Sequence, residues 1–158
     1  MNVVPRLYLD IDGVCLRRRP GNFRVRDAFA VAPHALLFLT WAIQNFEVRW
    51  LSSRCQTGDA RQVWNAFRYA LPATELPADW RFVAAIPAVR WSARKIDAID
   101  LSSNFFWCDD AHGEEALAIL TEQGKADRAI HVNVDRDPQA LLRARQMLAK
   151  TRGLWRSR

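Results

Sequence analysis

Four aspartates are placed where they could do chemistry together. Asp10 and Asp12 follow a short apolar run in the segment LYLDIDGV, and Asp109 and Asp110 directly follow the aromatic segment NFFWC. A cluster of Asp without His or Cys partners suits Mg²⁺, which prefers hard oxygen ligands, better than zinc. A carboxylate can attack phosphorus once a metal ion or a lysine relieves its repulsion with a phosphate. These residue types therefore indicate metal-assisted phosphoryl chemistry.

Other polar side chains stand close to further apolar runs. Ser52 and Ser53 follow EVRWL, with Arg54 next, and Lys95 lies in the segment SARKIDAID. If that segment is a helix, Lys95 stands in its first turn, where a cation opposes the helix dipole. A lysine at such a position invites a functional reason.

Each of these groups also has a plain structural interpretation. Asp-x-Asp-Gly is a common turn sequence, a serine can cap a helix, and the second aspartate pair can cap the segment GEEALAIL. Lys95 can simply be solvated. A calcium-binding loop after Asp10 is excluded, because Val14 and Cys15 stand where oxygen ligands would be needed. The groups are more specific together than singly, provided that the fold brings them to one place.

The elements that must position these residues alternate along the chain. The apolar patterns predict strands over residues 6–11, 47–52, 81–86, 104–108 and 129–134, and helices over 33–46, 58–71, 92–100, 113–124 and 137–150. This alternation predicts a three-layer α/β/α sandwich with a Rossmann-like parallel sheet. Ligands of such sheets bind at the carboxyl ends of the strands, so both aspartate pairs and the two serines are expected at one edge.

Length and composition limit the domain organisation. The chain has 158 residues, of which 50% are hydrophobic, and this fits one domain over residues 1–150 with a basic C-terminal tail over 151–158. The first residues lack a signal-peptide pattern, and no apolar run approaches the roughly 20 residues that span a bilayer. We therefore expect a cytoplasmic protein that has no membrane contact and no tightly bound organic cofactor. The spacing of Cys15, Cys55 and Cys108 fits neither zinc nor disulfides and predicts reduced thiols.

The order of the motifs resembles the haloacid dehalogenase (HAD) superfamily of phosphatases and phosphotransferases. LYLDIDGV, VRWLSSR, RKIDAI and FFWCDD correspond to its four motifs and span residues 7–110. The short form, with tryptophans inside two strands, looks most like the HAD domain of bacterial RNA-repair proteins, the Swiss Army Knife group. The resemblance implies that the first strand is central and is flanked by the strands of EVRWLS and NFFWC.

The resemblance also implies roles for individual residues. Asp10 would be the nucleophile and a magnesium ligand, and Asp12 the general acid and base, with its backbone carbonyl on the metal. Ser52, or Ser53 if the motif is shifted by one residue, would bind the phosphoryl oxygens. Lys95 would neutralise charge, and magnesium would also be held by Asp109 and by Asp110, the latter directly or through water. The acid at position 12 favours ester hydrolysis over carbon–halogen cleavage.

The substrate is harder to predict. The intervals between the motifs are too short for the cap domain that commonly selects substrates in this superfamily, so we expect an open, uncapped site. The segment 15–31 predicts a β-hairpin that turns at Pro-Gly-Asn, with Phe23, Val25 and Ala28 on one face. Such a flap would place arginines over the site. Together with two residues that follow the second strand, they give the substrate-binding candidates Arg17, Arg18, Arg19, Arg24, Arg54 and Ser53.

Three functions remain open at this stage. The first is a magnesium-dependent phosphatase of RNA or DNA ends or of nucleotides, which the net charge of +6 favours. The second is a phosphatase of a small phosphorylated metabolite, in which the basic surface is incidental. The third, a non-catalytic phosphate-binding module, is disfavoured because every acidic catalytic position is filled.

Overall fold

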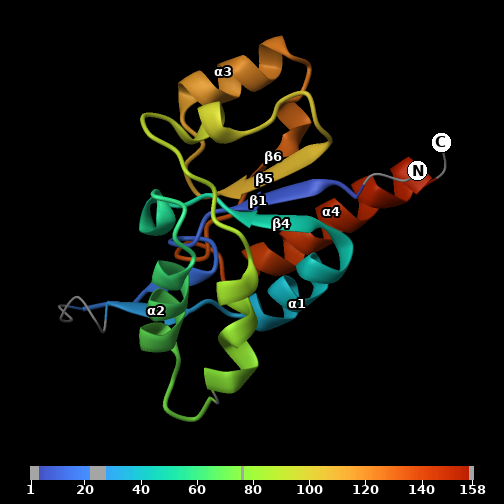
Figure 1. Ribbon diagram of the computed structural model, residues 1–158. Helices are drawn as coiled ribbons and strands as arrows, with labels where there is room; N and C mark the ends of the chain where they lie inside the picture. Colours follow the sequence, from blue (N-terminus) through green and yellow to red (C-terminus); the bar gives the residue numbers. More distant parts are fainter. Residues whose placement is uncertain (1–3, 22–27, 76, 157–158) are drawn as a thin grey trace.

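Four parallel strands form the central sheet of the protein. The computed structural model describes residues 4–21, 28–75 and 77–156, without the side chains of 152–156. The sheet has the order β4-β1-β5-β6 (Figure 1) and consists of β1 (Arg6–Leu9), β4 (Glu47–Trp50), β5 (Phe105–Asp109) and β6 (Ala129–His131). The parallel, Rossmann-like α/β fold predicted from the alternating pattern is therefore confirmed, and β1 lies between β4 and β5.

Helices cover both faces of the sheet. Figure 1 shows α1 (Ala35–Asn45) and α4 (Ala140–Arg156) on one side and α3 (Glu114–Glu122) on the other. Because side chains alternate along a strand, neighbouring residues enter different layers. Leu9 belongs to the buried cluster that includes residues of α1 and α4, whereas Tyr8 packs in the cluster that includes residues of α3. The layers therefore form around a sheet that is apolar on both faces.

A β-hairpin follows β1 and precedes α1. Its strands, β2 (Leu16–Arg18) and β3 (Phe29–Val31), pair antiparallel, which confirms the strand ends of the hairpin predicted over 15–31. Ala28 is half-buried. The predicted turn at Asn22, together with Phe23, Arg24 and Val25, lies outside the described residues.

The connection from β4 to β5 differs from the prediction. It contains the 3-10 helix η2 (Ser53–Cys55), helix α2 (Arg61–Ala70), and the 3-10 helices η3 (Pro77–Ala85) and η4 (Lys95–Ala98). The strand predicted over 81–86 is wrong, because η3 covers most of this segment. Trp80 and Val83, three residues apart, are both buried, and Trp80 packs on Phe67 of α2 with ring centroids 5.5 Å apart.

A short extended segment pairs with β4 a few residues later. Ala88 forms an isolated parallel bridge with Trp50, and the amide of Val89 donates to the carbonyl of Trp50 at 2.8 Å. The apolar run 81–86 therefore packs as a helical turn because its buried side chains repeat every three residues. Pairing with β4 begins only at Pro87, whose carbonyl accepts from the amide of Trp50 at 2.8 Å.

The helix predicted over 92–100 is also wrong, since only η4 forms there. Arg94 before it and Ile99 after it are extended, and Ile96 and Ile99 are the buried side chains of the segment. A three-residue spacing of buried groups suits one 3-10 turn better than an α-helix.

The C-terminal helix is longer than predicted. α4 continues through residues 151–156, which we had assigned to the basic tail. Among the residues that the structure describes, no helix combines the length and the apolar character needed to cross a membrane. All three cysteines are buried and free, as expected.

Candidate active site

The register of the sheet brings Asp10 next to Asp109. Leu9 pairs with Cys108 across the β1 and β5 strands, and the amide of Asp10 donates to the carbonyl of Cys108 at 3.0 Å. Both aspartates therefore leave neighbouring strands at the same edge, as the parallel topology predicted. Their side chains are buried: Asp10 is 7% exposed and Asp109 is 1% exposed.

Asp110 completes a group of three carboxylates. One oxygen from each of Asp10, Asp109 and Asp110 lies within 4.8 Å of the other two. Burial, and then the charge of Asp109, raises the pKa of Asp10, while Lys95 and a hydrogen bond from Ser52 oppose this rise. Burial followed by the charge of Asp10 likewise raises the pKa of Asp110. A group of carboxylates that is costly to ionise without a cation is a candidate metal site.

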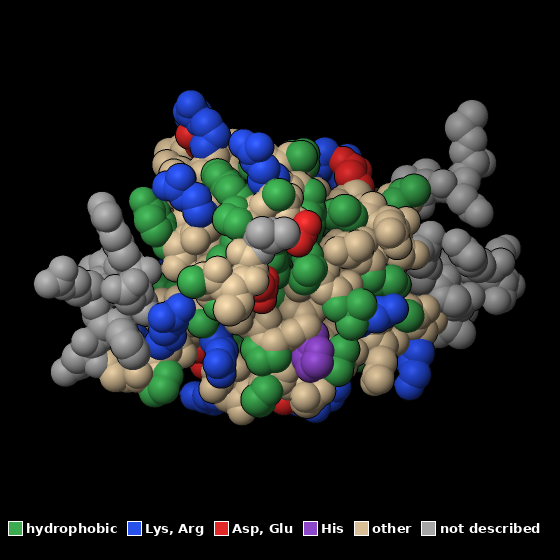
Figure 2. Space-filling view, turned by 90° about the horizontal axis from the view of Figure 1, so that it is seen from below, with side chains coloured by type: hydrophobic (Ala, Val, Ile, Leu, Met, Phe, Trp, Pro, Cys, Tyr) green, Lys and Arg blue, Asp and Glu red, His purple; other side chains and the backbone are tan. Residues whose placement is uncertain are grey.

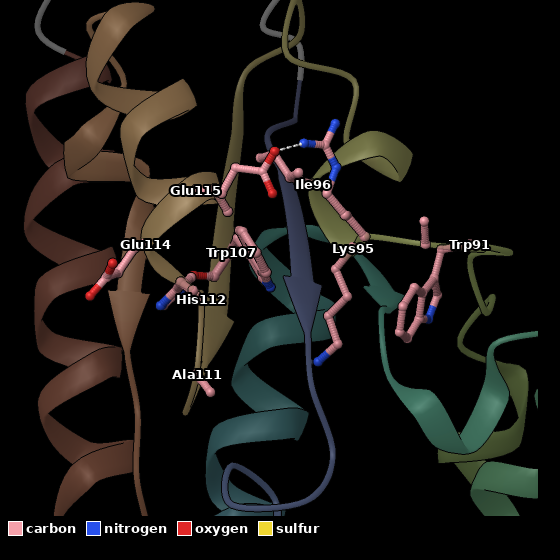
Figure 3. Close-up of a pocket in the computed structure, with 12 residues that line it drawn as sticks. Trp91, Lys95, Ile96, Trp107, Ala111, His112, Glu114 and Glu115 are labelled. Atoms are coloured by element: carbon pink, nitrogen blue, oxygen red, sulfur yellow. Dashed lines mark hydrogen bonds and ion pairs between the residues drawn. The ribbon is translucent and has the colours of Figure 1, made fainter.

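Lys95 supplies a positive charge inside this group. Its Nζ lies 2.8 Å from Oδ2 of Asp10 and 2.7 Å from Oδ2 of Asp109. In Figure 3 the side chain extends from η4 alongside β1 toward the carboxyl end of that strand. Burial alone would lower the pKa of Lys95, but the two carboxylates raise it above its ordinary value. The lysine is therefore a charged bridge between the ends of β1 and β5.

Trp107 fixes the direction of Asp109. Its indole Nε1 donates to Oδ2 of Asp109 at 3.1 Å, and the backbone amide of Ala111 donates to Oδ1 at 3.0 Å. We expected a tryptophan inside this strand but gave it no part in the site. The sequence contained a signal for this contact. Residues two apart on a strand point to the same face of the sheet, so the side chain of Trp107 lies on the face of Asp109, whereas that of Cys108 points to the other face.

Gly13 leaves room for Asp110. Its φ of +74° lies in the left-handed region, and a Cβ built on it would come within 2.6 Å of Cγ of Asp110 and closer still to Oδ2. The carbonyl of Gly13 also accepts from the amide of Val134 at 2.8 Å, which joins the loop after β1 to the segment after β6. The glycine in Asp-x-Asp-Gly therefore serves both the turn and the acidic group.

Asp12 points to Arg54 and stands apart from the three carboxylates. Nε of Arg54 lies 2.8 Å from each carboxylate oxygen of Asp12, and Nη2 lies 2.8 Å from Oδ1. The guanidinium also lies over the ring of Phe29 on β3, 4.6 Å from its centroid. Arg54, which we expected to bind substrate, thus orients the carboxylate expected to act as general acid.

The two serines after β4 have different surroundings. Ser52 is fully buried, its hydroxyl accepts from the amide of Arg54 at 3.4 Å, and its hydrogen bond to Asp10 lowers the pKa of that carboxyl. Ser53 is exposed and lines a hollow between β3 and α2. Ser52 is therefore the serine beside Asp10, although it also caps η2, as its structural interpretation proposed.

Arg17 and Arg19 of the hairpin line a groove that includes none of the three carboxylates of the acidic group. Arg17 and Arg18 are exposed, and the groove measures about 1030 Å³ and has Glu75 and Asp79 among its other residues. Figure 2 shows basic side chains mostly toward the margin of the lower face of the protein and acidic ones nearer its centre. The groove has mixed charge and is not a continuous basic track.

A second hollow opens beside Lys95. It measures about 340 Å³ and is formed by η4, the end of β5 and the start of α3, including Trp91, Trp107 and His112 (Figure 3). Nε2 of His112 donates a 3.0 Å hydrogen bond to the carbonyl of Trp107, and burial lowers the pKa of His112. The indole of Trp91 donates to the carbonyl of Ser52 at 3.1 Å, so this tryptophan supports the end of β4.

No protein-family model matches the chain, and no curated protein and no solved structure matches it. The function must therefore be argued from the site itself. What the site presents is a candidate metal-binding acidic group at the carboxyl edge of a parallel sheet, with a half-buried lysine and a buried serine beside it.

Proposed function

We propose that the protein is a magnesium-dependent phosphomonoester hydrolase of the HAD type that forms an aspartyl phosphate on Asp10. The observation that supports this most directly is the position of the Lys95 ammonium, within 2.8 Å of both Asp10 and Asp109. A buried nucleophile flanked by a fixed cation can approach a phosphate dianion, which an isolated carboxylate would repel.

The residues present fit a magnesium ion. The oxygens of Asp10, Asp109 and Asp110 lie within 4.8 Å of one another, and all three donors are carboxylates, the hard ligands that Mg²⁺ prefers. The backbone carbonyl of Asp12 is a further ligand implied by the resemblance. When bound, the ion would neutralise charge on the phosphoryl group. Lys95 and Ser52 would bind the remaining phosphoryl oxygens.

The chain supplies both proton transfers. Asp12 enters the first step in its protonated form. A carboxylate oxygen of Asp10 attacks phosphorus, the ester P–O bond breaks, and the departing oxygen takes the proton of Asp12, which leaves Asp12 as a carboxylate. A water molecule then attacks the aspartyl phosphate while Asp12 takes its proton, which releases phosphate and restores Asp10. General acid and base catalysis of this kind contributes about 10² to 10⁴-fold. Arg54 keeps the Asp12 carboxylate in one orientation for both steps.

Two substrate classes are candidates. Phosphate ends of RNA or DNA, or nucleotides, remain the first candidate. Arg17 and Arg18 were named from the sequence as residues that would contact such a substrate. The mixed charge of the neighbouring groove gives this candidate little electrostatic support beyond the net charge. A small phosphorylated metabolite is the alternative. A role in RNA repair has only the resemblance of the motifs behind it.

The test is a phosphate-release screen with nucleotides, phosphorylated oligonucleotides and sugar phosphates, with Mg²⁺ or with excess chelator. We expect magnesium-dependent turnover that is lost in Asp10→Asn and retained in Asp127→Asn, which changes an exposed aspartate outside the acidic group. Acid-quenched enzyme should also carry phosphate on Asp10. Failure of the wild type to release phosphate from any substrate, or equal activity of Asp10→Asn, would reject the proposal.

A further inference from the structure

A hollow of about 550 Å³ lies between the hairpin and helix α2. Its lining includes Phe29 from β3, Ser53 and Arg54 from η2, and Gln62, Asn65 and Tyr69 from α2. The three α2 residues stand at positions i, i+3 and i+7, so they share one face of the helix. The volume is in the usual range of roughly 300 to 1,000 Å³ for small-molecule sites.

Arg54 joins this hollow to the reaction centre. The same guanidinium that lines the hollow holds Asp12 through Nε and Nη2 at 2.8 Å. In the proposed reaction Asp12 protonates the departing oxygen, so that oxygen must lie beside Asp12. The group attached to it must then extend over Arg54 or away into solvent. The hollow beside Lys95 includes neither Asp12 nor Arg54 and is therefore on the wrong side for the leaving group.

The lining chemistry indicates what this leaving group is. Gln62 and Asn65 present side-chain amides, which both donate and accept hydrogen bonds, and Ser53 adds a hydroxyl. Phe29 and Tyr69 contribute aromatic rings. Among the described residues, Arg54 is the one cation in the lining, and its charge is already matched by Asp12. No carboxylate lines the hollow among the described residues.

This combination suits a flat, uncharged group with donors and acceptors on its edge. Amide side chains can pair with the edge of a base, and aromatic rings can stack on its face. A second phosphate would need an unpaired cation, and the part of the lining that the structure describes does not offer one. We propose that the hollow binds the nucleoside that leaves when the phosphate is transferred to Asp10, either as a mononucleotide or as the terminal nucleotide of a strand. This inference rests on the proposed function.

The experiment compares the double variant Gln62→Ala/Asn65→Ala with wild type and with Gln44→Ala, which changes an exposed glutamine of α1. Values of kcat/KM are measured for nucleoside monophosphates, oligonucleotides with terminal phosphates, glycerol phosphate and p-nitrophenyl phosphate. We expect the wild type to prefer nucleoside esters over glycerol phosphate. The ratio of nucleotide to p-nitrophenyl phosphate activity should fall at least 10-fold in the double variant, mainly through KM, and stay unchanged in Gln44→Ala.

The choice of substrates and variants distinguishes the possible results. Preference for mononucleotides identifies the free nucleotide as substrate, and preference for oligonucleotides identifies a strand end. A wild type that hydrolyses p-nitrophenyl phosphate without preferring nucleoside esters, or a double variant with an unchanged ratio, overturns the inference and leaves the phosphatase proposal standing. If no ester is hydrolysed, binding of unphosphorylated nucleosides by calorimetry decides: binding lost in the double variant supports the hollow, and no binding by wild type overturns it.

Discussion

The guanidinium of Arg54 holds both carboxylate oxygens of Asp12, with Nε 2.8 Å from each. The two residues are 42 positions apart and come from the loops after β1 and β4. The ring of Phe29 lies under the guanidinium at 4.6 Å and adds a cation–π contact from the hairpin. Arg54 is thus a positioning residue for the carboxylate that we propose as general acid.

Replacing Arg54 should slow the reaction according to the leaving group. In Arg54→Ala the carboxylate of Asp12 loses its fixed orientation, so kcat for an alkyl phosphate should fall by about 10 to 100-fold. The fall should be much smaller for p-nitrophenyl phosphate, because its leaving group departs without a proton. Steady-state kinetics at saturating substrate measure both values. Arg61→Ala, at an exposed ion pair with Asp59, is the control. Equal losses on both substrates would contradict the positioning role.

Removing the positive charge of Lys95 should destabilise the metal-free protein. Lys95→Met leaves Asp10 and Asp109 facing each other without compensation, and breaking a buried pair in this way costs about 3 to 5 kcal/mol of unfolding free energy. Denaturant unfolding measures the loss, and Mg²⁺ should recover more stability in this variant than in wild type. Lys150→Met, on the exposed surface of α4, should change little. A metal-free Lys95→Met variant as stable as wild type would show that the lysine does not compensate the two carboxylates.

Gly13 and Gly124 form a matched pair for testing the acidic group. Both have positive φ, +74° and +65°, so alanine at either position should cost about 1 to 2 kcal/mol for the backbone alone. A Cβ at Gly13 also collides with the carboxyl of Asp110, whereas nothing lies within 4 Å of a Cβ at Gly124. Calorimetric titration with Mg²⁺ should therefore show weaker binding in Gly13→Ala only. Equal magnesium affinity in the two variants would exclude Asp110 from the metal site.

The stabilisation by Mg²⁺ should depend on pH in a defined direction. Burial and the neighbouring aspartates raise the pKa of Asp10 and of Asp110, so the folded protein binds protons at these groups more tightly than the unfolded chain does. Protons then compete with the metal, and the rise in melting temperature caused by Mg²⁺ should be largest at neutral pH. It should shrink as the pH falls through the raised pKa values.

The difference between samples with and without Mg²⁺ isolates this effect. Glu47 and Asp97 have pKa values lowered by ion pairs with arginines, and their stabilisation is lost at acid pH whether or not the metal is present. If the rise in melting temperature caused by Mg²⁺ stays constant as the pH falls, Mg²⁺ binds elsewhere. In the single variant Asp110→Asn, the rise in melting temperature caused by Mg²⁺ at neutral pH should be smaller than in wild type.

The sequence predicted the parts of the site that follow from local pattern. The apolar runs before Asp10 and before Asp109 are buried strands, and alternation of strand and helix was enough to predict a parallel sheet with both aspartates at one edge. Segments with a less regular apolar pattern were assigned the wrong secondary structure. Residues 81–85 belong to a 3-10 helix in which Trp80 and Val83 are both buried. Trp80 packs on Phe67 of α2, a contact that local propensity does not encode.

The sequence by itself determined which residues form the candidate acidic group and at which edge of the sheet they lie, because strand periodicity and residue type are local properties. Tertiary structure decided their relations, because those contacts join residues far apart in the chain. It brought Lys95 between Asp10 and Asp109, set Arg54 on Asp12, and placed Ser52 rather than Ser53 beside the proposed nucleophile. It also formed the hollow between β3 and α2, whose residues come from three separate segments.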